Sequence, residues 1–379
     1  MQYRPFGKLD WQVSALGFGA MRLPVLSNDS GAINEEEATR MVRYAIDHGV
    51  NYVDTAYTYH GGQSESFLGR ALQGGYRQRV RLATKLPTWL VQKAEDFDRY
   101  LNEQLERLQT DHIDFYLLHN LKLPVWPHLR DLNILSRAEK ALSDGRIGHL
   151  GFSFHDQFEV FKQILDEYDG WTFCQIQYNY MDVNYQAGTR GLKYAADKGL
   201  AVVVMEPVRG GRLARNIPPA IQAIWDAAPT RRTPADWALQ WVWNQPEVAI
   251  ALSGMSAMEH VRENLESASR SAPGSLTEAD LALFPLAREK YKTLCPVPCT
   301  DCRYCMPCPS GVNISRIFEV YNDVIAYDAP DFGRFLYSLL PEGQQASACV
   351  ECGECLEKCP QSIEIPQWLE KAHEKLRRN

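Results

Sequence analysis

The sequence predicts an α/β protein in which an eight-stranded parallel (β/α)8 barrel of the TIM type is followed by a small, mainly helical domain. Short apolar runs alternate with amphipathic stretches across residues 1–270, which is the pattern of repeated β/α units. Nine of the ten cysteines lie between residues 295 and 359, so the C-terminal part has a different chemistry. The 379 residues accommodate a barrel of about 250 residues and an appendage of about 100.

Eight apolar runs are the predicted strands. Residues 201–205 read Ala-Val-Val-Val-Met, a continuous apolar run of the kind found in strands that are buried on both faces. The predicted strands are 15–19, 51–55, 80–85, 112–119, 147–154, 173–178, 200–207 and 248–253. An open, doubly wound sheet is the alternative, but the first strand is not followed by the G-x-G-x-x-G turn that such sheets use to bind dinucleotides.

Amphipathic stretches between these runs are the predicted helices. Their apolar residues recur with helical spacing, so each stretch has one face to pack against the barrel. The predicted helices are 35–48, 64–74, 94–109, 131–143, 157–168, 188–198, one longer stretch across 218–244, and 258–267. Eight β/α repeats are the number in a TIM barrel.

A turn-forming sequence marks the predicted domain boundary. Residues 271–275 read Ser-Ala-Pro-Gly-Ser, which favours a break in regular structure. Thr277 followed by Asp280 is a capping-box pattern for the first helix after this break. The further predicted helices are 315–327 and 330–340, which make the second domain mainly helical. The predicted domains are residues 1–275 and 276–379.

Composition and charge narrow the functional classes. Hydrophobic residues make up 45% of the chain and charged residues 23%, values typical of a globular protein. The formal net charge of −7 argues against nucleic acid or an anionic membrane as the partner. The first residues lack the apolar segment of a signal peptide, and no run of about 18 apolar residues is present, so we expect a cytoplasmic protein with no membrane span.

The cysteines form two runs with the spacing of iron–sulfur ligands. The run nearer the C-terminus contains Cys349, Cys352, Cys355 and Cys359, in the C-x-x-C-x-x-C-x-x-x-C-P spacing of bacterial 4Fe–4S proteins. The other contains Cys299, Cys302, Cys305 and Cys308, followed by Pro309. Without an export signal a disulfide framework is not expected, so metal binding is the favoured interpretation. Zinc also binds C-x-x-C pairs, but two quartets that each end in Cys-Pro favour iron–sulfur clusters.

The two runs together predict two clusters. In proteins with two 4Fe–4S clusters, the fourth cysteine of each run ligates the other cluster. The predicted ligand sets are Cys299, Cys302, Cys305 with Cys359, and Cys349, Cys352, Cys355 with Cys308. The run that begins at Cys299 has only two residues before its fourth cysteine, so Cys295 is an alternative ligand there. Cys174 is expected to be a buried strand residue.

Four ionisable residues lie at or just after the ends of consecutive predicted strands. Asp54 and Tyr59 follow the second strand, Lys85 ends the third, and His119 ends the fourth. Each could have a structural role by itself, as a loop cap, a rim residue or a solvated side chain. The C-terminal ends of barrel strands share one face, where active sites form, so we expect these four residues to meet there as catalytic groups.

The same residues carry a resemblance to a known family. Residues 54–59 read Asp-Thr-Ala-Tyr-Thr-Tyr, the D-T-A-x-x-Y motif of aldo-keto reductases, and residues 1–270 as a whole resemble that family. Further matching segments are Gly17-Phe18-Gly19, Leu68-Gly69, Gly145-x-Ile147-Gly148, Gly151-Phe152-Ser153 and Gln175-x-x-Tyr178-Asn179. The whole chain resembles a subgroup with a C-terminal ferredoxin-like 4Fe–4S domain. The resemblance implies an NAD(P)-dependent oxidoreductase that interconverts a carbonyl and an alcohol of a small-molecule substrate, with Asp54, Tyr59, Lys85 and His119 as the catalytic set.

The chemistry explains why these residue types belong together. Hydride delivery to a carbonyl carbon leaves negative charge on oxygen, which needs a proton from a positioned acid. The pKa of a free tyrosine is about 10, so Tyr59 needs the nearby cation of Lys85 to lower its pKa. Asp54 would hold Lys85 by pairing with it, and His119 would orient the carbonyl oxygen.

The resemblance also implies a nicotinamide cofactor site. Ser153 and Gln175 would bind the nicotinamide carboxamide, and Met205 stands where the family often places an aromatic ring. The turn Arg209-Gly210-Gly211-Arg212 offers backbone N–H groups and guanidiniums suited to a pyrophosphate, or is a plain exposed turn. The remaining expected contacts are Gly19, Met21, Pro207, Ser253, Gly254, His260 and Asn264.

The adenosine end of this expected site bears on cofactor choice. Family members specific for NADPH usually place a lysine and an arginine where this chain has Gly254 and His260. The loss of two cations favours NAD(H) over NADP(H). Arg262 or Arg212 could substitute for them, which leaves use of both cofactors open.

Two functions remain open from the sequence. Nicotinamide exchanges two electrons as hydride whereas a 4Fe–4S cluster exchanges one, and no flavin motif is found that would couple them. In the favoured hypothesis the protein is a nicotinamide-dependent oxidoreductase with structural or redox-sensing clusters. In the alternative, the C-terminal module exchanges electrons with a partner redox protein. The aromatic residues expected in the substrate loops are Tyr57, His60, Trp89 and Trp126.

Overall fold

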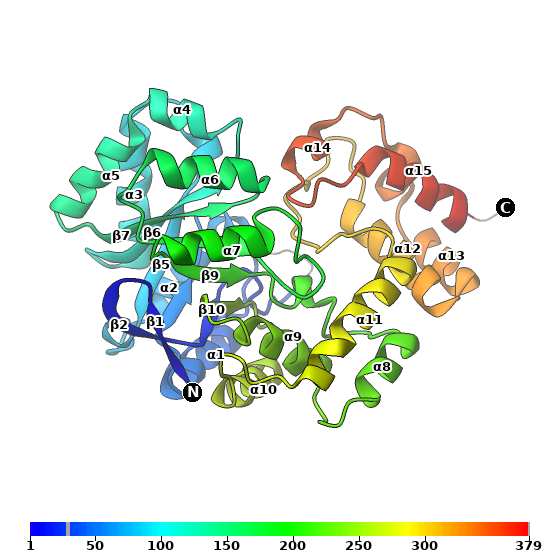
Figure 1. The fold of residues 1–379 in the computed structure, drawn as a ribbon. Coiled ribbons are helices and arrows are strands. Elements are labelled where there is room, and N and C mark those ends of the chain that lie inside the picture. Colours follow the sequence, from blue (N-terminus) through cyan, green and yellow to red (C-terminus); the bar gives the residue numbers. More distant parts are fainter. Residues whose placement is uncertain (28–30, 378–379) are drawn as a thin grey trace. The chain divides into compact units, whose positions relative to one another are not determined.

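The computed structural model describes residues 1–27 and 31–377 (Figure 1). The chain divides into two compact units, each built from two stretches of sequence. The barrel unit consists of Met1–Val208 and Ala235–Leu276, and the cysteine unit consists of Arg209–Pro234 and Thr277–Asn379. The segment 209–234 therefore groups with the cysteine-rich end of the chain, although it precedes the turn sequence at 271–275.

The barrel unit contains a closed, eight-stranded parallel barrel, which confirms the predicted fold class. The strand order is β10-β3-β4-β5-β6-β7-β8-β9, and the sheet closes because β10 pairs with both β9 and β3. This closure excludes the open, doubly wound alternative. The strands are β3 (Leu16–Gly19), β4 (Tyr52–Asp54), β5 (Arg81–Leu86), β6 (Ile113–Leu121), β7 (Ile147–Phe154), β8 (Phe173–Gln177), β9 (Ala201–Met205) and β10 (Val248–Ser253). Each overlaps one predicted strand.

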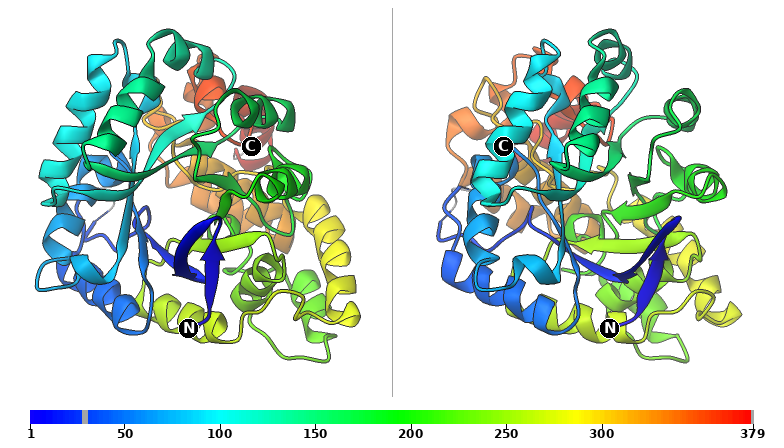
Figure 2. Two further views of the ribbon diagram at one scale, coloured as in Figure 1. Left: turned by 60° about the vertical axis from the view of Figure 1, so that its left-hand side comes forward. Right: turned by 90° about the vertical axis from the view of Figure 1, so that its left-hand side faces the viewer.

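An N-terminal hairpin closes one end of the barrel and was not predicted from the sequence. It consists of β1 (Tyr3–Phe6) and β2 (Leu9–Ser14), which pair in antiparallel register, and Figure 2 shows it as the dark blue pair of strands. The fully buried Phe6 ring lies 4.7 Å from that of Phe115 and 5.7 Å from that of Phe173, measured between centroids. Both partners lie near the N-terminal ends of their strands, so the hairpin leaves the opposite, C-terminal face for the site.

Helices follow the barrel strands as predicted. Those of the barrel unit are α1 (Glu35–Asp47), α2 (Ser64–Ala71), α3 (Glu95–Leu108), α4 (Trp126–Asp131), α5 (Ile134–Ser143), α6 (Phe158–Glu167), α7 (Gly188–Asp197), α9 (Pro234–Trp243) and α10 (Met258–Ser269). The prediction of one longer helical stretch across 218–244 is wrong. Proline lacks an N–H group and disfavours helical geometry in the residue before it, so Pro229 and Pro234 separate α8 (Pro219–Asp226) from α9.

The cysteine unit is helical, which confirms the second part of the predicted fold. Its helices are α8, α11 (Glu278–Leu294), α12 (Ile314–Tyr327), α13 (Pro330–Ser338), α14 (Glu354–Lys358) and α15 (Ile365–Leu376). The predicted capping box is present at the start of α11, where the Thr277 hydroxyl accepts a hydrogen bond from the Asp280 N–H at 3.1 Å and the Asp280 carboxylate accepts one from the Thr277 N–H at 3.1 Å. A core of Ile317, Phe318 and Leu369 packs against several of the cysteines.

None of the helices in residues 1–27 and 31–377 combines the length and apolar character needed to cross a membrane.

Candidate active site and iron–sulfur centre

The four ionisable residues predicted to act together meet at the C-terminal face of the barrel. Asp54 ends β4, Lys85 lies in β5 and His119 in β6, while Tyr59 begins the short 3-10 helix η1 (Tyr59–Gly62) that follows β4. Lys85 is fully buried, and His119, Asp54 and Tyr59 are 2%, 3% and 9% exposed. The neighbouring strands β4, β5 and β6 therefore supply one enclosed polar group.

Lys85 and Asp54 form a buried ion pair. The Lys85 ammonium donates hydrogen bonds to the Asp54 carboxylate (Nζ–Oδ1 2.7 Å) and to the Thr55 carbonyl oxygen (2.6 Å). Burial lowers the pKa of Lys85, and Asp54 opposes that shift. Burial also raises the pKa of Asp54, which the Lys85 cation opposes. Each residue thus supplies a counter-charge that opposes the effect of burial on the other.

The Lys85 ammonium lies against Tyr59. Its Nζ atom is 5.0 Å from the centroid of the Tyr59 ring. A cation at this distance favours the phenolate over the phenol, so it lowers the cost of losing the Tyr59 proton. This is the relation between the two residues that proton donation at neutral pH requires.

His119 completes the group as a neutral imidazole. Its ring centroid is 6.2 Å from that of Tyr59, with an interplanar angle of 81°, and 5.1 Å from that of Trp89. Burial, with a smaller contribution from the Lys85 cation, places the pKa of His119 well below its usual 6.5. The ring is therefore uncharged at neutral pH, with one nitrogen able to donate a hydrogen bond.

Ser153 and Gln175 lie side by side where the nicotinamide was expected. Their Cα atoms are register partners on β7 and β8, and both side chains are buried. Ser153 Oγ accepts a hydrogen bond from the Asn120 N–H at 2.8 Å. Gln175 Nε2 contacts Met205 Sδ at 3.5 Å, and Gln175 Oε1 is buried without a hydrogen-bond partner in the described part of the chain. This unpaired acceptor suits the N–H of a carboxamide, so the residues fit a nicotinamide.

The residues expected at the adenosine end also come together. Asn264 Nδ2 on α10 donates to Ser253 Oγ at the end of β10, at 3.0 Å. Gly19 lies against the Ser253 carbonyl oxygen, where an added Cβ would be at 3.3 Å. The side chain of Arg22 lies across Gly254, so that a Cβ on Gly254 would be 3.2 Å from it.

Arg22 is a cation that the sequence reasoning missed at this end. Its position next to the expected contact Met21 was the available signal. Arg262, which the sequence offered as a substitute cation, lies with its guanidinium 5.8 Å from the centroid of the Tyr44 ring. His260 lies on α10 and is partly exposed.

The turn predicted to bind a pyrophosphate belongs to the cysteine unit. Arg209–Gly211 forms the 3-10 helix η4, and Gly210 and Gly211 have φ angles of +65° and +90°, which glycine adopts without strain. Burial raises the pKa of the Cys299 thiol, and the Arg212 cation is among the groups that oppose this shift. The structure therefore places Arg212 within electrostatic reach of a predicted cluster ligand.

Of the aromatic residues expected in the substrate loops, Trp89 lies beside His119 and is 44% exposed. The others have structural contacts. The Tyr57 hydroxyl donates to Glu103 at 2.8 Å, and His60 Nε2 accepts from the Leu23 N–H at 3.1 Å. Trp126 is buried and donates to Glu167 at 2.6 Å. Trp89 thus combines a contact with His119 and an exposed surface, as expected of a residue in a substrate loop.

The thiols of the two cysteine runs lie within electrostatic reach of one another. The thiol of Cys305 is influenced by those of Cys299, Cys359 and Cys355, of which the last two belong to the other run. The thiol of Cys355 is influenced by those of Cys349, Cys352 and Cys308, which again joins the two runs. The neighbours of Cys355 belong to its predicted ligand set, whereas those of Cys305 come from both predicted sets, so the division of the cysteines between two clusters stays a prediction.

A hollow in the cysteine unit has the lining that a cluster needs. Its lining contains all four cysteines of one predicted ligand set, Cys308, Cys349, Cys352 and Cys355, together with Cys305 of the other. Within the described ranges, no three His, Cys, Asp or Glu side chains converge on a point where a single metal ion could bind. A 4Fe–4S cluster spaces its thiolates around a larger body, so the donor set of the hollow fits a cluster.

Comparisons with known proteins agree with this geometry. Residues 15–275 match the model of the aldo/keto reductase family, and residues 298–364 match a 4Fe-4S dicluster domain. The chain is 27% identical to L-galactose dehydrogenase of Arabidopsis thaliana over 283 residues, which cover 70% of this chain and 87% of that protein. It is 25% identical to an NADH-specific methylglyoxal reductase of Escherichia coli over 328 residues, which cover 75% of this chain and 97% of that protein.

A solved structure gives the same result. An aldo-keto reductase from Bacillus halodurans, in its holo form, superposes with a TM-score of 0.64 at 27% identity. The superposition covers 76% of this chain and 96% of that one. The chain therefore belongs to the aldo/keto reductase family, with a 4Fe-4S dicluster domain at its C-terminal end.

Proposed function

We propose that this protein is a cytoplasmic, NAD(P)H-dependent oxidoreductase that interconverts a small-molecule carbonyl and its alcohol, with Tyr59 as the proton donor. The observation that carries the proposal is the buried Lys85–Asp54 ion pair, whose ammonium lies 5.0 Å from the centroid of the Tyr59 ring. Reduced nicotinamide, when bound, supplies the hydride.

The four side chains divide the work on the proton. As charge develops on the carbonyl oxygen, the Tyr59 O–H gives its proton to that oxygen, and the Lys85 cation stabilises the phenolate that remains. Asp54 keeps Lys85 ionised and in place. Neutral His119 donates a hydrogen bond that orients the carbonyl oxygen. In the oxidative direction the phenolate of Tyr59 accepts the proton of the alcohol.

The residues that would hold the nicotinamide are Ser153, Gln175 and Met205. Gln175 Oε1 would accept from the carboxamide N–H, and the Met205 thioether would pack against the ring. Gly254 and His260 favour NAD(H), and one relative is itself named as NADH-specific. Arg22 beside Gly254 and Arg262 on α10 supply the cations that could serve NADP(H).

We also propose two 4Fe–4S clusters with a structural or redox-sensing role. The grouping of the Cys305 thiol with that of Cys359, and of the Cys355 thiol with that of Cys308, supports crossed ligation between the two runs. Each cluster exchanges one electron, so the clusters do not replace the hydride donor of the barrel.

The test is anaerobic purification with iron and sulfide analysis, followed by titration with NADH and NADPH against a panel of carbonyls. The panel includes methylglyoxal and sugar aldehydes, because relatives are named for methylglyoxal, galactose and 6-dehydroglucose. We expect about eight iron atoms per chain and oxidation of reduced nicotinamide that depends on the carbonyl. No such oxidation with any carbonyl of the panel would contradict the proposal.

One observation favours electron exchange with a partner protein as a second candidate function. Val350 is 70% exposed and Cys352 is also exposed, so one predicted ligand loop faces solvent. The distinguishing result is reduction of the clusters by an added reduced ferredoxin together with turnover that requires no nicotinamide. Nicotinamide-dependent turnover that survives in a folded Cys359→Ser variant decides for the first function.

A further inference from the structure

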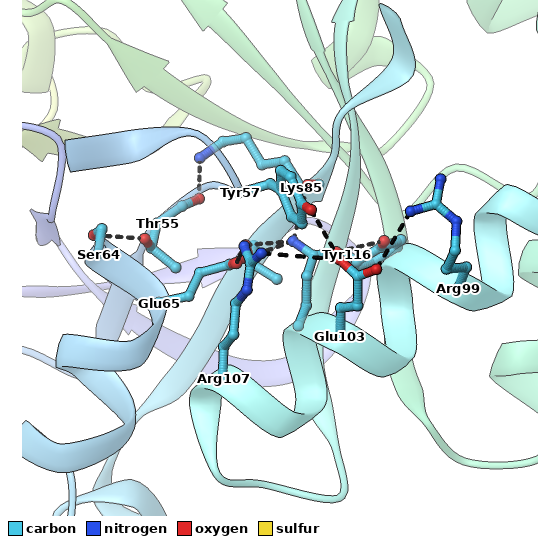
Figure 3. A network of polar contacts seen from close by, with 11 residues as sticks. Thr55, Tyr57, Ser64, Glu65, Lys85, Arg99, Glu103, Arg107 and Tyr116 are labelled. Carbon is cyan, nitrogen blue, oxygen red and sulfur yellow. Dashed lines mark hydrogen bonds and ion pairs between the residues drawn. The ribbon is translucent and has the colours of Figure 1, made fainter. Parts of the chain in front are cut away.

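A buried polar network lies next to Lys85 and contacts its main chain, and Figure 3 shows Glu65 and Tyr116 of this network near Lys85. It joins Glu65 on α2 to Thr84 on β5, Gln104 on α3 and Tyr116 on β6. All four side chains are fully buried, which is a costly environment for a carboxylate. The buried carboxylate of Glu65 is therefore a candidate for a role in addition to packing.

Burial raises the pKa of Glu65, and the hydrogen-bond donors and the cation around it oppose that shift by favouring the carboxylate. Its Oε1 atom accepts hydrogen bonds from Thr84 Oγ1 at 2.6 Å and Gln104 Nε2 at 2.5 Å, and its Oε2 atom lies 3.3 Å from Arg107 Nη1. The orientation of the Gln104 amide is fixed by its other partners. Its Nε2 atom donates to the Lys85 carbonyl oxygen at 3.1 Å, and its Oε1 atom accepts from the Tyr116 hydroxyl at 2.7 Å. Glu65 therefore meets donors at both oxygens.

The first turn of α2 holds Lys85 from two sides. On one side, Glu65 fixes Gln104, which binds the Lys85 main chain. On the other side, the hydroxyl of Ser64 lies 2.8 Å from that of Thr55, whose carbonyl oxygen accepts the second hydrogen bond of the Lys85 ammonium. Adjacent residues of one helix thus fix both the base of Lys85 and one acceptor at its tip.

We propose that Glu65 is a positioning residue for the reaction: its buried carboxylate, paired with the partly exposed Arg107, sets the protonation of Lys85 and, through it, the acidity of Tyr59. The proposal rests on the proposed function, because it acts on the proton donor assigned there.

The charges around Lys85 and Glu65 form a balanced set. Facing Lys85 are the Asp54 carboxylate on β4, the Tyr59 phenol on η1 and the neutral His119 imidazole on β6. The carboxylate of Glu65 adds a second negative charge that favours the charged form of Lys85, and so raises its pKa against the effect of burial.

The groups around Glu65 complete the set. Facing it are the Arg107 guanidinium on α3 and the Tyr116 phenol on β6, whose pKa burial holds well above 10. Arg107 is the outer member, 29% exposed, with its guanidinium 4.2 Å from the centroid of the Tyr57 ring and its Nη2 atom 3.9 Å from Glu103. The two positive charges of Lys85 and Arg107 therefore match the two negative charges of Asp54 and Glu65.

Removing the charge of either Glu65 or Arg107 changes the electrostatic potential at Lys85 and Tyr59 in a known direction. Without the negative charge of Glu65, the potential becomes more positive, which lowers the pKa of both Lys85 and Tyr59. Without the positive charge of Arg107, the pKa of both groups rises. At high pH, kcat/KM falls as Lys85 or Tyr59 loses its proton; we call this fall the alkaline limb of the rate profile. The pH at which it occurs must move in opposite directions in the two variants, whichever of the two groups causes it.

The test compares Glu65→Gln with Arg107→Gln. Both replacements remove one charge and introduce a neutral amide that can still form hydrogen bonds. The measurement is kcat/KM for carbonyl reduction between pH 5 and 10, with NADH and the best carbonyl of the panel. We expect the alkaline limb to move down by about one pH unit in Glu65→Gln and up by a smaller amount in Arg107→Gln.

A matched control is Glu103→Gln on the same helix as Arg107. It removes one carboxylate that binds Tyr57 and Arg99 and is 35% exposed. Because solvent screens this charge, the alkaline limb should move by less than about a third of the shift in Glu65→Gln. A positioning role also predicts that the Kd for NADH, measured by fluorescence, stays within about twofold in all three variants.

The outcomes separate the inference from the proposed function. If Tyr59→Phe keeps wild-type turnover, the proposed function fails whatever the Glu65 variants do. If Tyr59→Phe is inactive while Glu65→Gln and Arg107→Gln share the wild-type limb, only the inference is overturned, and Glu65 has a purely structural role. Should Glu65→Gln fail to fold, the upward shift in Arg107→Gln still decides the question, because that side chain is partly exposed.

Discussion

Replacing Lys85 with methionine tests the buried ion pair most severely. The two side chains are 0% and 4% exposed, and Nζ and Oδ1 are 2.7 Å apart. Methionine keeps an unbranched chain of similar length but removes the ammonium, so the Asp54 carboxylate is left buried without its cation. Removing one partner of a buried pair costs about 3–5 kcal/mol.

The structure narrows that range. Asp54 Oδ2 already lacks a hydrogen-bond partner among the described residues, so the carboxylate loses its ammonium partner at Oδ1 and has no other to fall back on. Asp54 can escape by binding a proton, and from an unfolded-state pKa of about 3.9 this costs about 4 kcal/mol at pH 7 and about 1.5 kcal/mol at pH 5. We therefore expect a loss in the free energy of unfolding close to 4 kcal/mol at pH 7 that shrinks as the pH falls.

The assay is anaerobic urea unfolding followed by tryptophan fluorescence, at pH 7 and pH 5, for the wild type, Lys85→Met and the double variant Lys85→Met with Asp54→Asn. The double variant should recover most of the stability, because no buried charge remains, and should stay inactive. A deficit below about 1 kcal/mol, as for an exposed pair, would refute the reasoning. So would a deficit that is the same at both pH values.

Three further predictions follow from other parts of the molecule. His119 has a folded-state pKa well below its unfolded value, so the unfolded chain binds more protons and the free energy of unfolding falls as the pH drops below about 6.5. His119→Gln should reduce the slope of the free energy of unfolding against pH by about 1.4 kcal/mol per pH unit, measured by urea unfolding between pH 6.5 and 5. Cys359→Ser should lower the iron content by up to about four atoms per chain, whereas Cys174→Ser, at a buried strand residue, should leave it unchanged, and equal iron losses in the two variants would argue against the assigned ligands. Arg22→Ala should raise the KM for NADPH by a larger factor than the KM for NADH, and equal factors would remove Arg22 from the adenosine end.

The barrel could be predicted because each of its strands is buried on both faces. Residues 147–154 and 248–253 have the same bounds in the sequence prediction and in the structure, since their apolar runs stop where the chain reaches solvent. The meeting of Asp54, Lys85 and His119 could be predicted because each of them lies at or near the end of a predicted strand. Topology brings these ends to one face whatever their separation in the sequence.

The features that were missed depend on tertiary context. The strands of the N-terminal hairpin are short, and what orders them is the packing of Phe6 on the barrel end. The break in 218–244 needed the prolines to be given more weight than the apolar pattern. The sequence analysis did not single out Glu65 or Gln104, because nothing local in the sequence shows that these two helix residues are buried partners.

The most direct test of the account is turnover of Tyr59→Phe in the anaerobic holoprotein, together with its affinity for NADH. The account predicts that carbonyl reduction falls by at least about a hundredfold, because the proton donor is gone, while the Kd for NADH changes by less than about twofold. Carbonyl reduction at nearly the wild-type rate would contradict it.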